Sequence, residues 1–228
     1  MIRKRLVVLT GAGISAESGI RTFRDMGGLW EEYDVMEVAS PEGWAKNPQL
    51  VLRFYNERRS QLKNAQPNLA HKTLAEEETN FIVHIITQNV DNLHERAGSS
   101  NVLHLHGELT KARSTVNDNS IKDIGYSEIN WGDKCEKGFQ LRPHIVWFGE
   151  AVPAMDEAIK LVRSAEIFAV VGTSLNVYPA AGLLDYVPKC CPIYLIDPND
   201  VGVWRRDVTV IKEKASVGVP VMFEMIKK

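Results

Sequence analysis

Three polar side chains follow an apolar run in the middle of the chain, and their types suit contact with a sugar or an amide. Gln88, Asn89 and Asp91 come shortly after the run 81–86, which reads FIVHII. In an open α/β sheet, ligands bind at the carboxyl ends of the strands. Amide and carboxylate groups there can hydrogen-bond ribose hydroxyls and a carboxamide. The alternative is structural, because Asn89 or Asp91 can also cap a following helix.

Two histidines lie further along, at positions 104 and 106. On an extended segment, residues two apart point to opposite faces, so we expect His104 and His106 to have separate roles. His106 is the candidate base because the glycine after it leaves room for a ligand, although a single histidine is more often structural. Metal binding by the pair is disfavoured, because no third ligand is evident nearby.

A glycine turn follows the first apolar run of the chain. Residues 11–16 read GAGISA, which fits the G-x-G-x-x-G/A pattern of dinucleotide-binding turns and predicts NAD as the ligand. A plain strand-to-helix turn is the alternative. A hydride-transferring dehydrogenase also needs an acidic residue after a second strand, about 20 residues on. Glu31 and Glu32 instead follow the sequence GGLW, so hydride transfer is disfavoured.

These candidates need a scaffold, and the pattern of apolar runs predicts one. Several runs are apolar throughout, as is typical of strands covered on both faces in a parallel sheet. The expected strands are 6–9, 81–86, 144–148, 167–171, 193–196 and 208–211. The expected helices are 41–63, capped by Ser40 and broken at Pro48, then 67–78, 153–164 and 179–187. The alternation predicts an α/β fold with a Rossmann-like, doubly wound parallel sheet.

Two stretches interrupt the alternation, and we interpret both as insertions. Residues 27–79 carry helical patterns and no strand, and residues 110–143 are polar and rich in turns. We expect one domain over 1–228. Its Rossmann-like part covers 1–26, 80–109 and 144–228, and a small inserted subdomain is formed by 27–79 and 110–143.

Composition excludes several classes of partner. The chain has 228 residues, a net charge of −2 and only three cysteines. The charge gives no general attraction to nucleic acid or to an anionic membrane. No apolar stretch approaches the roughly 18 residues of a membrane span. An odd and small number of cysteines is not a disulfide framework, so we expect a reducing, cytoplasmic location.

Five segments together resemble the sirtuin family of NAD-dependent protein-lysine deacylases. They are GAGISAESGIRTFR at 11–24, TQNVD at 87–91, HLHG at 104–107, HIVWFGE at 144–150 and GTS at 172–174. They occur in the family's order across nearly the whole chain. The resemblance implies that NAD is a co-substrate: the acyl oxygen of a modified lysine attacks the nicotinamide ribose, and nicotinamide and O-acyl-ADP-ribose are released. His106 would then deprotonate a ribose hydroxyl, which suits an ordinary pKa near 6.5.

The resemblance also implies a set of site residues. His106 and Asn89 would be catalytic. The expected NAD contacts are Gly11, Ala12, Gly13, Ser15, Ala16, Phe23, Arg24, Trp30, Gln88, Asn89, Asp91, Gly172, Thr173, Ser174, Asp197, Asn199 and Ala215. An acyl-lysine peptide would dock as an added strand between 148–150 and 175–178, close to Val146, Phe148 and Gly149.

Tyr55 and Arg58 suggest which acyl group is removed. Residues three apart share one face of a helix, and a phenol beside a guanidinium can bind both oxygens of a carboxylate. The pair resembles that of the class III bacterial sirtuins, which remove succinyl, malonyl and glutaryl groups. The small Ala39 matches the roomier pocket of that class. The alternative is a solvated basic face that includes Arg53 and Arg59, and acetyl-lysine can still be a substrate.

The segment between Leu109 and Leu141 departs from the family. Sirtuins usually carry two Cys-x-x-Cys pairs there, which hold zinc. In this chain those places fall on Ser114, Asn117, Lys134 and Lys137, and only Cys135 lies nearby. We therefore expect no zinc and a mobile segment. Its packing is expected around Ile121, Ile124, Tyr126, Ile129 and Trp131.

The expected partners are acyl-lysine proteins or peptides, bound by a monomer. Two other functions stay open at this point. One is protein mono-ADP-ribosyl transfer, in which a protein side chain takes the ADP-ribose. The other is a non-catalytic NAD sensor, which the presence of Asn89, Asp91 and His106 together disfavours, because a module that only binds NAD needs no base.

Overall fold

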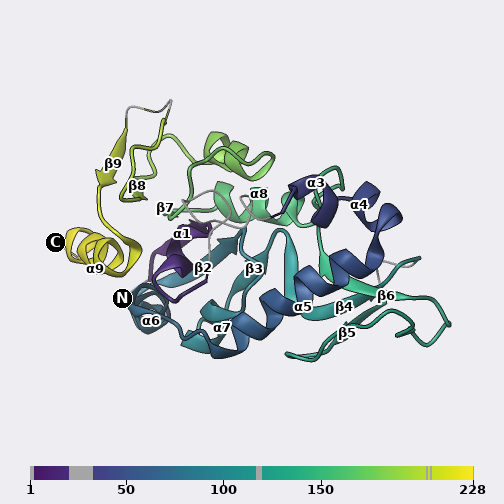
Figure 1. Cartoon of the computed structure of the whole chain (residues 1–228). Helices are drawn as coiled ribbons and strands as arrows, with labels where there is room; N and C mark the ends of the chain where they lie inside the picture. The colour runs from purple at the N-terminus through teal and green to yellow at the C-terminus, as the bar shows by residue number, and fades with distance from the viewer. Residues whose placement is uncertain (1–2, 21–32, 117–119, 204, 206, 228) are drawn as a thin grey trace.

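A six-stranded parallel sheet forms the centre of the molecule (Figure 1). The computed structural model describes residues 3–20, 33–116, 120–203, 205 and 207–227. The strand order is β3-β2-β1-β7-β8-β9, and every neighbouring pair is parallel. The strands are β1 (Arg5–Thr10), β2 (Ile82–Thr87), β3 (Val102–His104), β7 (Ile167–Val171), β8 (Ile193–Ile196) and β9 (Val208–Ile211). Five of these were predicted, and the three-residue β3 was not.

Alternate residues of the central strand β1 face two separate cores. Val7 and Leu9 pack in the cluster with α8 (Met155–Arg163) and the 3₁₀ helix η2 (Ala180–Tyr186). Leu6 and Val8 pack on the opposite face, in the cluster with α6 (Leu69–Glu76) and α9 (Ala215–Ile226). The sheet is therefore covered on both faces, which confirms the doubly wound α/β prediction.

The predicted break in the first long helical region is confirmed. Helix α4 (Pro41–Lys46) ends before α5 (Pro48–Asn64), and the Ser40 hydroxyl accepts a hydrogen bond from the Gly43 N–H at 2.9 Å as an N-cap. The other short helices are α1 (Gly13–Ala16), α3 (Val35–Val38), η1 (Glu77–Thr79) and α7 (Leu93–Ala97). The expected helix at 179–187 is the 3₁₀ helix η2, and α9 was not predicted.

The strand expected at 144–148 does not belong to the parallel sheet, and that prediction is wrong. The strand β6 (Leu141–Ile145) pairs antiparallel with β4 (Gly107–Ser114), which also pairs with β5 (Ile121–Asp123). A parallel pairing needs a long crossover connection, usually helical. The stretch before β6 has no helical pattern that could form such a crossover. The strand therefore pairs antiparallel in a local sheet. The proposed boundaries of the inserted subdomain stay a prediction.

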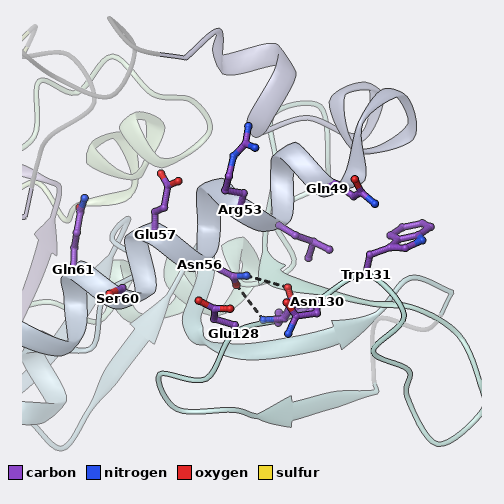
Figure 2. Close-up of a pocket in the computed structure, with 11 residues that line it drawn as sticks. Gln49, Arg53, Asn56, Glu57, Ser60, Gln61, Glu128, Asn130 and Trp131 are labelled. Carbon is purple, nitrogen blue, oxygen red and sulfur yellow. Dashed lines mark hydrogen bonds between the residues drawn. The ribbon is translucent and has the colours of Figure 1, made fainter.

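The small sheet packs on α5 around part of the expected set. Ile129 is buried with Leu52, Ala112 and Leu141, and Ile124 packs against them, as expected. Ile121 and Trp131 are exposed, so their expected core role is wrong. The Asn56 side chain pairs with both backbone groups of Ile129, each at 3.0 Å, inside an open cavity of about 820 Å³ (Figure 2). One helix thus fixes the position of the small sheet.

Within the described part of the chain, no helix is both long enough and apolar enough to cross a membrane.

Candidate functional site

A cavity of about 620 Å³ lies where the strands of the parallel sheet end. Segments that follow β1, β2, β7 and β8 meet there, and α5 and the loop after β6 contribute to its wall. The predicted residues that line it are Gly11, Ala12, Gly13, Ser15, Ala16, Ala39, Tyr55, Arg58, Gln88, Asn89, Asp91, His106, Val146, Phe148, Gly149, Gly172, Thr173, Ser174, Asp197, Asn199 and Ala215. Phe23, Arg24 and Trp30 lie outside the described residues.

The glycine turn packs closely against the loop that follows β7. The Gly11 N–H donates to the Val171 carbonyl at 3.0 Å, and the Gly13 N–H donates to the Gly172 carbonyl at 2.9 Å. A Cβ at Gly13 would lie 2.7 Å from the Gly172 Cα, so no larger residue fits. Gly172 itself has a φ of +62°, which favours glycine. Glycine backbone from the turn after β1 and from the loop after β7 therefore forms this wall of the cavity.

Asn89, Asp91 and Ser15 form one buried polar network beside the turn. The Asn89 amide donates to the Gly11 carbonyl at 3.0 Å and to the Ser15 hydroxyl at 3.2 Å. Ser15 in turn donates to the Asp91 carboxylate at 3.0 Å. Burial raises the pKa of Asp91, and hydrogen bonds from the Leu93 N–H and from Ser15 oppose that shift. Asp91 thus both holds the chain at the start of α7 and lines the cavity.

The His106 ring is held in its neutral form. Its Nδ1 lies 2.9 Å from the Gln88 carbonyl, which can only accept, so Nδ1 carries the proton and Nε2 keeps its lone pair. Burial lowers the pKa of His106, and the Gln88 carbonyl opposes that shift. Gly107, which follows, has a φ of +81°, and a Cβ there would lie 2.0 Å from the His144 carbonyl oxygen. A glycine is therefore required directly after His106.

His104 has different partners, as expected from its position. Its Nδ1 lies 3.0 Å from the Asn89 carbonyl oxygen, and its Nε2 lies 2.7 Å from the Glu95 carboxylate. Burial alone would lower the pKa of His104, but Glu95 outweighs burial and the net shift is upward. His104 does not line the cavity, whereas His106 does.

Tyr55 and Arg58 lie buried at the wall formed by α5. Their exposed fractions are 2% and 9%, which contradicts the alternative of a solvated basic face. The Arg58 Cζ lies 5.9 Å from the centroid of the Tyr55 ring. Burial raises the pKa of Tyr55 to about 12, so the phenol keeps its proton at neutral pH. The cavity therefore has a phenol and a guanidinium close together, away from bulk water.

Some cavity residues were missed at the sequence level, and Trp147 is the most informative. It lies within the segment HIVWFGE, but its indole Nε1–H donates to the Tyr55 hydroxyl at 3.1 Å, a contact between residues 92 positions apart.

Glu150, which ends that segment, accepts hydrogen bonds from Arg113 and Arg142. The Phe148 N–H donates to the Ala39 carbonyl at 3.0 Å and so brings Ala39 to the cavity.

The residues at the usual zinc positions do not fit a zinc ion. Ser114 and Cys135 are neighbours, with Sγ and Oγ 3.5 Å apart, but the next candidates are lysines. No group of three or more His, Cys, Asp or Glu side chains that could hold a metal occurs among the residues the structure describes. Asn117 lies outside that part. The four thiolate or imidazole ligands that structural zinc requires are not assembled within the described residues.

Comparison with known proteins agrees with this geometry. The Sir2 family model matches residues 11–179. An NAD-dependent protein deacylase of Bacteroides thetaiotaomicron is 56% identical over 98% of both chains, and one of Helicobacter pylori (strain 26695) is 60% identical over 86% of this chain and 85% of its own. A crystal structure of a Sir2 homolog–NAD complex is 42% identical, with a TM-score of 0.88 over 98% of this chain and 90% of that one. The chain belongs to the Sir2 family, the sirtuins.

Proposed function

We propose that this protein is an NAD-dependent protein-lysine deacylase that prefers acidic acyl groups such as succinyl and malonyl. Its close relatives carry the name NAD-dependent protein deacylase. The observation that carries the acyl preference is the burial of Tyr55 and Arg58 in the wall of the cavity that also holds His106. Acetyl-lysine is proposed as a second, poorer substrate.

The cavity suits NAD as a substrate. Its volume of about 620 Å³ lies within the range of cofactor sites. Asn89 and Asp91 would hold the nicotinamide ribose and carboxamide. The buried Asp197 carboxylate accepts from the Asn199 N–H at 2.9 Å and would accept ribose hydroxyls of the adenosine half. NAD supplies an electrophilic ribose carbon and nicotinamide as the leaving group.

His106 supplies the base of the reaction. Its free Nε2 would take the proton of a ribose hydroxyl, which lets that oxygen attack the acyl carbon. Because Nδ1–H is bound to the Gln88 carbonyl, the ring can hold the new positive charge without turning. Water then adds at the acyl carbon and the lysine amine leaves, so that acyl-lysine, NAD and water give free lysine, nicotinamide and O-acyl-ADP-ribose.

Arg58 and Tyr55 would recognise the far end of the acyl chain. The guanidinium can bind both carboxylate oxygens, and the phenol O–H can donate to one of them. The small Ala39 side chain leaves room for a longer acyl group. A carboxylate that enters this buried site gains strong, poorly screened interactions, whereas an acetyl group makes none of them.

An acyl-peptide panel tests the proposal directly. Wild-type protein with NAD is given one lysine peptide in unmodified, acetyl, malonyl and succinyl forms, and nicotinamide release is measured. We expect release with all three acyl forms, with the highest kcat/KM for the acidic ones. No nicotinamide release with any acyl peptide would contradict the function, and an equal or higher kcat/KM for acetyl would contradict the acidic preference. Label transferred from NAD to protein would instead indicate mono-ADP-ribosyl transfer.

The dependence of activity on pH follows from the environment of His106. A general base works only when deprotonated, and burial lowers the pKa of His106 below its ordinary value of 6.5. Activity should therefore persist as the pH falls through 6.5 and decline only below it. The measurement is kcat/KM for a succinyl peptide between pH 5 and 9. An acidic limb with its midpoint at or above 6.5 contradicts this assignment.

Further properties are proposed on independent grounds. The partners are acyl-lysine proteins, and nucleic acid and membranes are not partners, in keeping with a net charge of −2. All three cysteines are free thiols, which supports a cytoplasmic location. We also propose a monomer, and a small subdomain without zinc, because lysines stand at two of the usual ligand positions.

A further inference from the structure

The hydrogen bond between Trp147 and Tyr55 has only one possible direction. An indole N–H donates and cannot accept, so the Tyr55 oxygen uses a lone pair in this 3.1 Å contact. The phenol proton is therefore not used by Trp147. No described residue accepts it either, and Tyr55 lines the cavity. The phenol is thus kept as a donor with its proton available to a ligand.

We propose that Trp147 is a positioning residue for acyl specificity, which acts by holding the Tyr55 phenol as a hydrogen-bond donor toward an acidic acyl group. This inference rests on the proposed deacylase function. A hydroxyl can rotate its proton toward any neighbouring acceptor. With the indole N–H against its lone pair, the phenol keeps its ring position and presents its proton to the carboxylate that Arg58 binds.

Trp147 is itself fixed by a charged cluster made of Arg113, Arg142 and Glu150. The Arg142 guanidinium lies over the indole, with Cζ 3.2 Å from the ring centroid. The backbone N–H of Trp147 donates to the Glu150 carboxylate at 2.8 Å, and both Arg142 and Arg113 bind the same carboxylate, at 2.7 and 3.0 Å. Glu150 keeps its negative charge, since hydrogen bonds from Arg142 and Trp147 outweigh burial and lower its pKa. The indole therefore has little freedom to turn.

The role predicts an effect on one class of substrate. A succinyl or malonyl group has a distal carboxylate that can accept the Tyr55 proton, whereas an acetyl group has none. Loss of the indole N–H should therefore lower kcat/KM for succinyl and malonyl peptides and leave kcat/KM for the acetyl peptide nearly unchanged. A merely structural role for Trp147 would lower both activities together.

The test is Trp147→Phe, which removes the N–H and keeps an aromatic ring. A net hydrogen bond in a protein contributes about 0.5–1.5 kcal/mol, so we expect kcat/KM for the succinyl peptide to fall about threefold to tenfold, mainly through KM. The acetyl peptide should change less than twofold. Trp44→Phe is the matched control, because Trp44 packs 5.7 Å from Trp147 but does not line the cavity.

A double-mutant cycle with Tyr55→Phe isolates the coupling. In the Tyr55→Phe background, Trp147→Phe should cause no further loss of succinyl selectivity over acetyl. Additive losses, equal losses on both substrates, or unchanged selectivity in Trp147→Phe would overturn the inference. Should Trp147→Phe unfold, benzothienylalanine at position 147 keeps the bicyclic shape and replaces the N–H with sulfur. A wild type without acidic preference would instead contradict the proposed acyl specificity.

Discussion

Arg58→Met is expected to lower kcat/KM for a succinyl-lysine peptide by at least about thirtyfold and to leave acetyl-lysine within about threefold. The guanidinium is buried, and truncating one partner of a buried charge pair typically costs about 2–5 kcal/mol. Methionine keeps the length and apolar stem of the side chain, so packing on α5 is preserved. The measurement is steady-state kinetics on both peptides with saturating NAD.

Arg53→Met is the matched control for this prediction. Arg53 lies on the same helix and is exposed. It lines the cavity of about 820 Å³ beside Asn56 and Ile129, not the cavity that holds His106 (Figure 2). The same loss of charge there should leave both activities unchanged. An equal fall on succinyl and acetyl peptides in Arg58→Met would show a role in NAD binding or folding, and would remove Arg58 from acyl recognition.

His106→Asn is expected to lower the rate of lysine deacylation by about 10²–10⁴-fold, the usual contribution of a positioned general base. An asparagine amide can still donate to the Gln88 carbonyl, which His106 now binds at 2.9 Å, but it cannot take up a proton. NAD affinity should therefore stay close to that of the wild type. Kd by calorimetry and kcat from peptide deacylation separate the two effects.

A control for the histidine variant comes from β2. His84 is half-buried on that strand and does not line the cavity, so His84→Asn should keep the activity of the wild type. Turnover in His106→Asn within tenfold of the wild type would remove His106 as the base. Loss of NAD binding in the same variant would assign it to substrate binding.

The scaffold of the site was largely predictable because its strands are buried on both faces. Runs such as 167–171 are apolar throughout, and the ends of such strands meet at one edge of the sheet. The spacing of Tyr55 and Arg58 gave their shared helix face, but not their burial. The run 144–148 was placed in the wrong sheet, because an apolar run alone does not say which strand is its neighbour.

The finer features depend on contacts between distant positions. The pairing of Trp147 with Tyr55 and the packing of Asn56 on Ile129 join residues more than 70 positions apart, and neither has a local signal. Helix α9 was missed because Gly218 and Pro220 lower its helical propensity. Its apolar face against the sheet stabilises it instead, with Val219, Met222 and Phe223 buried.

The most direct test of the central claim is the mass balance of one reaction. Wild-type protein, NAD and a succinyl-lysine peptide are incubated together, and the products are identified by mass spectrometry. We predict one nicotinamide and one O-succinyl-ADP-ribose for each lysine freed. Free succinate in place of O-succinyl-ADP-ribose, without loss of NAD, would contradict the account.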